Sequence, residues 1–368
     1  SRGPVVRSGM TDRTIEGPVV VSRKGQARIE RGHPWVFRSD IVKDGGATPG
    51  AIVRVADVRG TPLGFALWSS RSEIRLRMIE RGESLPESFF RDRIERALRW
   101  RETVAAGAEA YRVVHGEGDS LPSLVVDRYG EYLSVQTLSQ GTERAKPEIG
   151  AALVELLDPK GIVERNDPRV RTLEGLEQTV SVLHGEVPDA VEVSEGDVRF
   201  RVDLRRGQKT GLFLDQRENH LAARQYARGR VLDGFTYDGG FALQVARHAD
   251  EVTAVDLSAE ALERVKANAA RNGIANVTTR DANVFDLLKE LNRQYGLDLP
   301  AWRQFGRYVA GHVERGDGFS CGAICGNLIG ALHGEAALPQ DWLAELEGRA
   351  TLERLADDFV AEMTDARP

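Results

Sequence analysis

The stretch GRVLDGFTYDGGFALQVARHADEVTAVD, residues 229–256, decides the fold class of this chain. A short apolar run ends on Asp233, a glycine-bearing turn follows, and an amphipathic segment leads into a second apolar run that ends on Asp256. This order predicts a strand, a helix and a second, parallel strand. Asp256 lies 16 residues after Gly240, the last glycine of the turn, where a carboxylate holds the ribose hydroxyls of a nucleoside-type cofactor.

The glycines of the turn indicate the kind of cofactor. They do not follow the Gly-x-Gly-x-x-Gly pattern of dinucleotide binding, which brings backbone close to a pyrophosphate. The Asp-x-Phe-x-x-x-Gly-Gly pattern instead resembles motif I of the class I S-adenosylmethionine-dependent methyltransferases. The resemblance implies that this cofactor is bound by Asp233, Phe235, Gly239 and Gly240. A β-α-β unit without a ligand is the alternative.

Length and composition describe a globular chain. Its 368 residues, 41% hydrophobic and 29% charged, are enough for two or three domains. No apolar run approaches the roughly 20 residues of a membrane span, and no signal-peptide pattern opens the sequence, so we expect a cytoplasmic protein without membrane association. The two cysteines, Cys321 and Cys325, predict neither a disulfide framework nor a metal site.

Basic residues are concentrated towards the N-terminus. Residues 1–100 carry 19 Lys and Arg against 12 Asp and Glu, whereas residues 301–368 carry 6 against 11. This excess predicts that the N-terminal part binds a polyanion, with a merely solvated basic surface as the alternative. Residues 1–17 are polar and aperiodic, and we expect them to be disordered and to precede the folded part.

Short alternating runs broken by glycine predict a small β-barrel over residues 18–85. The stretch RGHPWVFRSD, which begins at Arg31, resembles the PUA domain, an RNA-binding module at the head of a family of ribosomal RNA cytosine-5 methyltransferases. Arg31 and Arg38 fit phosphate contacts, and Trp35 suits stacking on a base. Burial of Trp35 inside the barrel is the alternative.

Strands and helices alternate over residues 86–196, which predicts an α+β middle domain beginning with a charged helix. The run HGEGDSLPSLVVDRYG, residues 115–130, is similar to the middle domain of the same family. Glu117 and Asp119 lie in a glycine-rich turn, where they are either acid–base groups or, more often, turn formers.

The stretch GQKTGLFLDQR, residues 207–217, matches the signature of that family almost residue for residue. The resemblance implies that it lines the methyl-transfer cleft, with Asp215 and Gln216 near the cofactor and Lys209 and Arg217 towards the RNA. The residues by themselves predict only a turn with a charged cluster.

A Rossmann-like cofactor domain is predicted over residues 197–290. After the opening unit come a helix capped by Ser258 and a third strand. Asp281 and Asn283 then stand where, by resemblance, methyltransferases read the adenine ring.

The resemblance stops near Leu288. The family continues with a fourth strand and an Asp-Pro-Pro loop, but the later prolines, Pro300, Pro339 and Pro368, form no such motif. Residues 291–368 instead predict an acidic helical tail, so the sheet should stop after its third strand.

Within that tail, residues 314–360 resemble the end of an ADP-ribosylglycohydrolase. Asp317 and Ser320 match its di-magnesium motif, but Phe319 replaces the second acid, so we expect no metal site. Cys321 is the only stand-in for the cysteine nucleophile of cytosine methylation, and a small packed residue is its ordinary interpretation.

The sequence therefore predicts an α/β chain with three parts: a PUA-like barrel, an α+β middle domain and an incomplete Rossmann-like methyltransferase domain with a helical tail. By resemblance, the chain uses S-adenosyl-L-methionine to make 5-methylcytosine in large-subunit ribosomal RNA. We also consider a homodimer, which the sequence does not decide. A noncatalytic RNA- and S-adenosylmethionine-binding protein is the first alternative, because the Asp-Pro-Pro loop is missing. A function of the glycohydrolase-like tail is the second.

Overall fold

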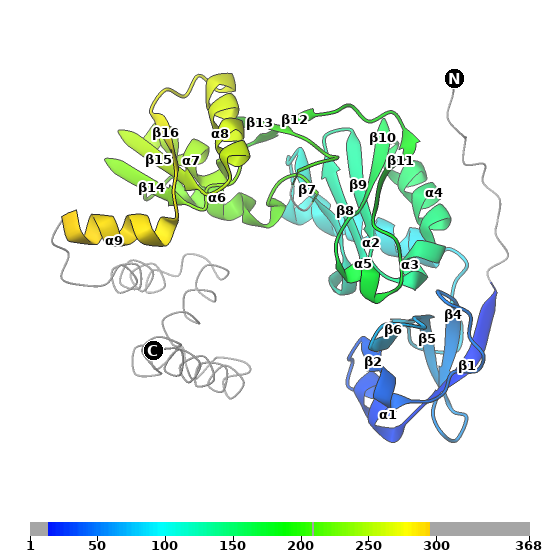
Figure 1. The fold of residues 1–368 in the computed structure, drawn as a ribbon. Helices are drawn as coiled ribbons and strands as arrows, with labels where there is room; N and C mark the ends of the chain where they lie inside the picture. The colour runs from blue at the N-terminus through cyan, green and yellow to red at the C-terminus, as the bar shows by residue number, and fades with distance from the viewer. Residues whose placement is uncertain (1–13, 208–209, 295–368) are drawn as a thin grey trace. The chain divides into compact units, whose positions relative to one another are not determined.

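The computed structural model describes residues 14–207 and 210–294, which form two compact units that divide between Arg217 and Glu218 (Figure 1). The first unit contains a six-stranded sheet, a five-stranded sheet and a β-hairpin, and the second contains a three-stranded sheet. This mixed architecture confirms the predicted fold class. Within the described ranges, no helix has the length and apolar character needed to cross a membrane.

The N-terminal sheet has the strand order β2-β6-β5-β4-β1-β3. Its strands and short helices are β1 (Ile15–Val21), α1 (Arg23–Glu30), β2 (Trp35–Phe37), η1 (Arg38–Asp40), β3 (Ile41–Lys43), β4 (Ile52–Ala56), β5 (Pro62–Trp68) and β6 (Ile74–Glu80). Strand β1 begins at Ile15, opposite Ile52 of β4, so the segment expected to precede the fold contributes three residues to the sheet. One of the alternating runs behind the barrel prediction, ARIE at residues 27–30, lies in helix α1 and not in a strand; Ser22 caps this helix by accepting the Gly25 N–H.

The middle sheet has the order β11-β10-β9-β8-β7, with its helices packed beside it (Figure 1). Its elements are α2 (Phe89–Val104), β7 (Ala110–His115), η2 (Gly116–Asp119), β8 (Leu124–Tyr129), β9 (Tyr132–Thr137), α3 (Gln140–Arg144), α4 (Lys146–Leu157), β10 (Gly161–Asn166), α5 (Val170–Leu173) and β11 (Thr179–Gly185). All six residues of β10 are buried, and the strand is paired with β9 on one edge and β11 on the other.

The N-terminal sheet, predicted as a barrel and called the barrel below, shares one hydrophobic core with the middle sheet. Phe65 and Leu67 of the barrel belong to the same buried cluster as Leu133 of the middle sheet. A buried ion pair also joins the two, with Arg77 donating to Glu174 at 2.7 Å. The two parts that the sequence analysis separated at residues 85 and 86 therefore pack on each other through a common core.

A hairpin of β12 (Val191–Glu195) and β13 (Val198–Val202) follows the middle sheet. The expected boundary between residues 196 and 197 falls in the turn of this hairpin. The first unit then ends through η3 (Leu214–Gln216), and α6 (Arg217–Ala223) leads into the second unit.

The second unit contains the predicted β-α-β motif. Its elements are β14 (Arg230–Gly234), α7 (Gly240–Val245), η4 (Ala246–His248), β15 (Glu251–Asp256), α8 (Ala259–Arg271), β16 (Val277–Asp281) and α9 (Val284–Gln294). The three strands are parallel in the order β14-β15-β16. Ser258 caps α8 by accepting the Ala261 N–H at 3.2 Å, as predicted. All but the first four residues of the expected helical tail lie outside the described residues, and so does Cys321.

Candidate functional site

Three predicted acids lie at one edge of the second unit's sheet. Gly234 is opposite Val255, and Asp256 is opposite Asp281, so the carboxyl ends of the parallel strands are level. Asp233 comes one residue before the end of β14. The carboxyl edge of a parallel sheet is where α/β folds bind ligands. The three acids therefore lie at the edge where a cofactor site is expected.

Asp233 shapes the turn. Its side chain is nearly buried, at 9% exposure, and Oδ2 accepts the Thr236 hydroxyl at 2.5 Å and the Ala242 N–H at 2.9 Å. Burial raises the pKa of this carboxyl, and the two hydrogen bonds reduce that rise because they stabilise the charged form. Asp233 therefore connects the end of β14 to the first turn of α7 and fixes the backbone that lies between them.

Asp256 fixes the other side of the same turn. Its Oδ2 accepts the Tyr237 N–H at 3.0 Å, and its Oδ1 accepts the Ser258 N–H at 2.9 Å. The side chain is only partly buried at the carboxyl end of β15. Both strand-end acids thus hold backbone amides, a role that their spacing in the sequence did not reveal.

The glycines of the turn permit close packing. Gly239 has φ +84° and precedes α7, a conformation that suits glycine. A Cβ at Gly240 would lie 2.5 Å from the ring of buried His220. Phe235 and Tyr237 also have positive φ, 62° and 49°, which is uncommon for bulky residues and is typical of functional turns.

Large apolar side chains are exposed around this edge. Phe235, Leu257 and Phe285 are 61%, 66% and 63% exposed, and the rings of Phe235 and Phe285 are 5.7 Å apart. A flat, partly apolar group such as a purine fits such a surface, because it would cover carbon that otherwise faces water. Leu257 and Phe285 were not predicted from the sequence, although each follows a predicted site residue by one or two positions.

Asp281 and Asn283 differ in what they contact. Asp281 is exposed at the end of β16. The Asn283 side chain accepts the Phe285 N–H at 2.9 Å, so it caps the start of α9. The turn also contains Asp238, which the sequence did not single out; burial raises the pKa of its carboxyl, and Arg264 lies 2.5 Å away.

The signature residues belong to the first unit. Asp215 and Gln216 lie in η3, with Gln216 Nε2 3.4 Å from Asp215 Oδ2. Arg217 donates to the Val104 carbonyl at 3.1 Å. Lys209 lies outside the described residues. Asp215 and Gln216 thus come from one unit, and the predicted residues of the turn come from the other.

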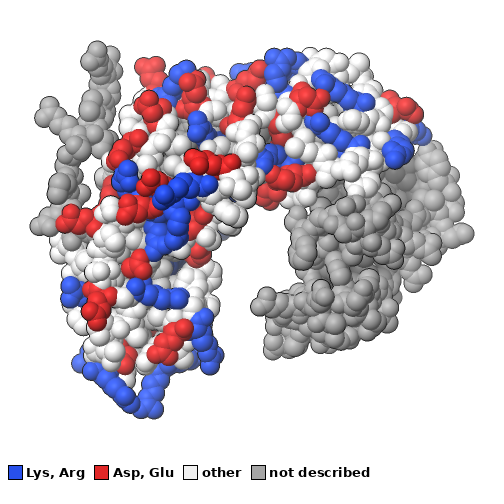
Figure 2. All heavy atoms as spheres, turned by 180° about the vertical axis from the view of Figure 1, so that it is seen from behind, with Lys and Arg blue, Asp and Glu red and all other residues white. Residues whose placement is uncertain are grey.

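The predicted RNA-binding residues of the barrel lie at its surface. Arg31 and Arg38 are exposed, and Arg38 is 3.6 Å from Glu73. Trp35 is half-buried, and its indole N–H donates to Glu117 of the middle sheet at 2.9 Å, which leaves both its interpretations open. Lys and Arg side chains gather at the end of the barrel, at the lower left of Figure 2.

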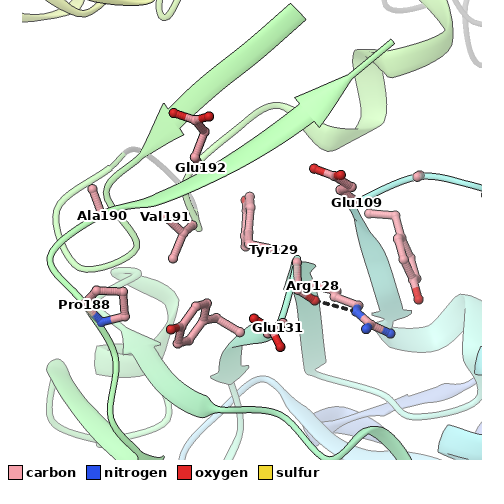
Figure 3. Close-up of a pocket in the computed structure, with 12 residues that line it drawn as sticks. Glu109, Arg128, Tyr129, Glu131, Pro188, Ala190, Val191 and Glu192 are labelled. Atoms are coloured by element: carbon pink, nitrogen blue, oxygen red, sulfur yellow. Dashed lines mark hydrogen bonds between the residues drawn. The ribbon is translucent and has the colours of Figure 1, made fainter. Parts of the chain in front are cut away.

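A pocket of about 670 Å³ opens between β12 and the near ends of β7, β8 and β9 (Figure 3). Tyr132 is part of the pocket's lining, and two of the charged lining residues bond to backbone groups of the protein. Glu109 accepts the Ser194 N–H at 2.7 Å, and Arg128 donates to the Gly130 carbonyl at 2.7 Å. The pocket contains none of the residues predicted for the site.

Comparisons with known proteins define the class of protein. The sequence profile of the PUA-like domain family matches residues 19–81, and that of the ADP-ribosylglycohydrolase family matches residues 245–368. A Streptococcus mutans structure, described as a SAM-dependent methyltransferase, has a TM-score of 0.64 at 23% identity and covers 76% of this chain and 74% of its own. A methyltransferase structure complexed with SAH gives the same TM-score, 0.64, and covers 76% and 73%. The fold is that of a SAM-dependent methyltransferase with a PUA-like domain.

Curated relatives define the family. Ribosomal RNA large subunit methyltransferase I of Klebsiella pneumoniae is 36% identical over 297 residues, which are 77% of this chain and 74% of that protein. The protein of the same name from Escherichia coli O139:H28 is 36% identical over 262 residues, 69% of this chain and 66% of its own. The chain belongs to the family of ribosomal RNA large subunit methyltransferase I. Both resemblances stated from the sequence are thereby confirmed, and the glycohydrolase match extends back into the cofactor unit.

Proposed function

We propose that this chain transfers a methyl group from S-adenosyl-L-methionine to C5 of a cytosine in large-subunit ribosomal RNA. The observation that carries the proposal is the edge of the second unit's sheet. There, Asp233 and Asp256 hold a glycine turn in a strained conformation beside exposed apolar side chains. Family membership supports the ribosomal RNA substrate, and the resemblance of the signature stretch supports the cytosine.

The residues at this edge fit S-adenosylmethionine. Asp256 would hold the ribose hydroxyls, Phe235 and Phe285 would contact the adenine ring, and Asp281 would accept from its amino group. Gly239 and Gly240 keep side chains away from the turn that receives the amino-acid part. The bound cofactor supplies an electrophilic methyl group on its sulfonium.

Methylation at C5 of cytosine needs a thiolate that first adds to C6. Cys321 and Cys325 are the two cysteines of the chain, and both lie outside the described residues. We propose Cys321 as the nucleophile to test first. Cys321→Ala should abolish methyl transfer and leave cofactor binding unchanged, whereas Cys325→Ala, the matched control, should retain both.

The deciding experiment measures tritiated methyl incorporation into undermethylated large-subunit ribosomal RNA, with binding of S-adenosylhomocysteine measured on the same preparation. Incorporation at C5 of one cytosine, located by nucleoside analysis, supports the proposal. Cofactor binding without incorporation refutes it and favours the noncatalytic RNA- and S-adenosylmethionine-binding alternative.

The proposal extends to the organisation of the chain. Residues 18–85 bind RNA through Arg31, Arg38 and Trp35, residues 86–196 support them, and residues 197–290 bind the cofactor with the signature stretch at their start. We place the protein in the cytoplasm, where its RNA substrate is modified, and as a homodimer. Light scattering during size-exclusion chromatography tests the homodimer, and a monomeric mass at micromolar concentration would refute it.

A further inference from the structure

Thr210 and Leu212 of the signature stretch are held by buried side chains of strand β8. The described residues Gly207 and Thr210–Leu212 are called the signature turn below. The Thr210 hydroxyl donates to Oδ2 of Asp127, and the Leu212 N–H donates to the Tyr129 hydroxyl at 3.0 Å. The Tyr129 hydroxyl is also 3.3 Å from Oγ1 of Thr210. Asp127 and Tyr129 are fully buried, and Thr210 is 1% exposed, so water does not compete for these bonds.

These contacts form a directed chain of hydrogen bonds. Arg112 binds Asp127 through two bonds of 2.8 Å and 3.0 Å, and the carboxylate so paired only accepts. The Thr210 proton therefore points to Asp127, which leaves Thr210 Oγ1 to accept from Tyr129. Burial raises the pKa of Tyr129, so its hydroxyl keeps the proton that it donates to Thr210 in this series of hydrogen bonds. Each hydroxyl both donates and accepts, and removing either one breaks the chain.

Strand β10 holds the opposite side of the turn. Arg165 is 2% exposed, and its guanidinium donates to the carbonyl of Leu204 at 2.9 Å and to that of Gly207 at 2.7 Å. Fixed donors at two carbonyls define the direction in which the chain enters the turn.

Gly211 lets the turn lie against Tyr129, and Gly207 lets the chain pass close to Asp203. A Cβ at Gly211, where φ is +145°, would lie 3.0 Å from the Tyr129 hydroxyl and 2.5 Å from Cγ1 of Val202. A Cβ at Gly207 would lie 2.7 Å from the Asp203 carbonyl oxygen. Gly211 is thus explained by its close approach to Tyr129 of the middle sheet, and Gly207 by the close approach of the chain to itself at Asp203.

We propose that Asp127 and Tyr129 are positioning residues for methyl transfer: through Thr210 and Leu212 they hold the signature turn in the geometry that the reaction on RNA requires. This inference rests on the proposed function. It gives the middle sheet a specific task, because residues more than 80 positions earlier in the chain set the conformation of the signature.

The test combines hydrogen exchange with kinetics on the full-length chain. Tyr129→Phe and Thr210→Val each remove one hydroxyl from the chain of hydrogen bonds. Exchange at the Leu212 amide, followed by mass spectrometry, should become about tenfold faster in Tyr129→Phe, as expected for the loss of one buried hydrogen bond. Both variants should lower kcat for methyl transfer by about tenfold or more, with KM for S-adenosylmethionine within about twofold of wild type.

Two controls separate positioning from general destabilisation. Thr210→Ser keeps the hydroxyl and should retain most of the wild-type kcat, whereas Thr210→Val should not. Tyr132→Phe removes a hydroxyl from the strand residue paired with Tyr129 and should change neither measurement.

Unchanged exchange at Leu212 in Tyr129→Phe would overturn the anchoring. Faster exchange with wild-type kcat would overturn the positioning role. A wild-type chain that transfers no methyl group would refute the proposed function and the positioning role together, and the exchange measurement would still show whether these bonds hold the turn.

Discussion

Replacing Gly240 by alanine tests how closely the turn packs against helix α6. Gly240 is the first residue of α7, and a Cβ there would lie 2.5 Å from Cε1 and 2.6 Å from Nε2 of His220. Carbon contacts are favourable at roughly 3.5–4.0 Å, so the ring or the turn must move by about 1 Å. The ring is held in place, because His220 is 7% exposed and packs edge-on against Phe241 with centroids 4.5 Å apart.

The expected magnitude follows from two opposing effects. Overpacking of a well-packed site costs about 1–3 kcal/mol. The higher helix propensity of alanine offsets up to about 1 kcal/mol inside a helix, and less at a first position. We therefore expect Gly240→Ala to lower the free energy of unfolding of the second unit by about 1–2 kcal/mol. Because the turn moves, S-adenosylhomocysteine should bind about tenfold more weakly, equivalent to roughly 1.4 kcal/mol.

Urea unfolding and isothermal titration calorimetry measure the two effects. His220→Ala in the Gly240→Ala background removes the clash, so the double variant should be at least about 1 kcal/mol more stable than the sum of the single changes predicts. Gly150→Ala in α4 is the matched control, because nothing lies within 4 Å of a Cβ there. Wild-type stability of Gly240→Ala, or strict additivity with His220→Ala, would refute the packing argument.

Three further predictions concern charge. Burial raises the pKa of Asp233 above its ordinary 3.8, so the native state holds this proton more tightly than the unfolded chain and stability falls as pH rises above that value. Asp233→Asn should therefore raise the urea midpoint more at about pH 8 than at about pH 4; equal effects would contradict this. Arg77→Met leaves the buried Glu174 carboxylate without its partner and should cost about 3–5 kcal/mol in urea unfolding, and a loss below about 1 kcal/mol would count against a buried pair. Arg31→Gln and Arg38→Gln should each make the slope of log K for RNA binding against log salt concentration shallower by about one. An unchanged slope would exclude a phosphate contact by that arginine.

The strands and the main helices of the second unit could be predicted because each has a local signal. Apolar runs end at Asp233 and Asp256, and Ser258 begins a helix as an N-cap. Helix α1 also begins after a capping serine, Ser22, but the alternating residues 27–30 favoured a strand at this position. Its position depends on Gly25, where a Cβ would lie 3.2 Å from the Cβ of Asp40, a contact that only the folded chain creates.

The candidate site shows the same division between local and long-range information. The sequence identified Asp233 and Asp256 by their place at strand ends, but not their backbone partners, which depend on the shape of the turn. The partners of the signature were not predictable at all. Thr210 and Asp127 are 83 residues apart, and no spacing rule relates a turn to a strand of another sheet.

The shared core of the first unit decides which fragments can be used to test RNA binding. Ile52, Phe65, Leu67 and Ile79 of the barrel are at most 8% exposed because the middle sheet covers them. A fragment limited to residues 18–85 would expose these side chains at a cost of about 1.5–3 kcal/mol each, and it would lose the partner of Arg77. A failure of this fragment to bind RNA would therefore reflect its loss of folding and not the loss of an RNA contact. A fragment ending at residue 217 keeps the core and the ion pair, so only there does loss of binding in an arginine variant report on a phosphate contact.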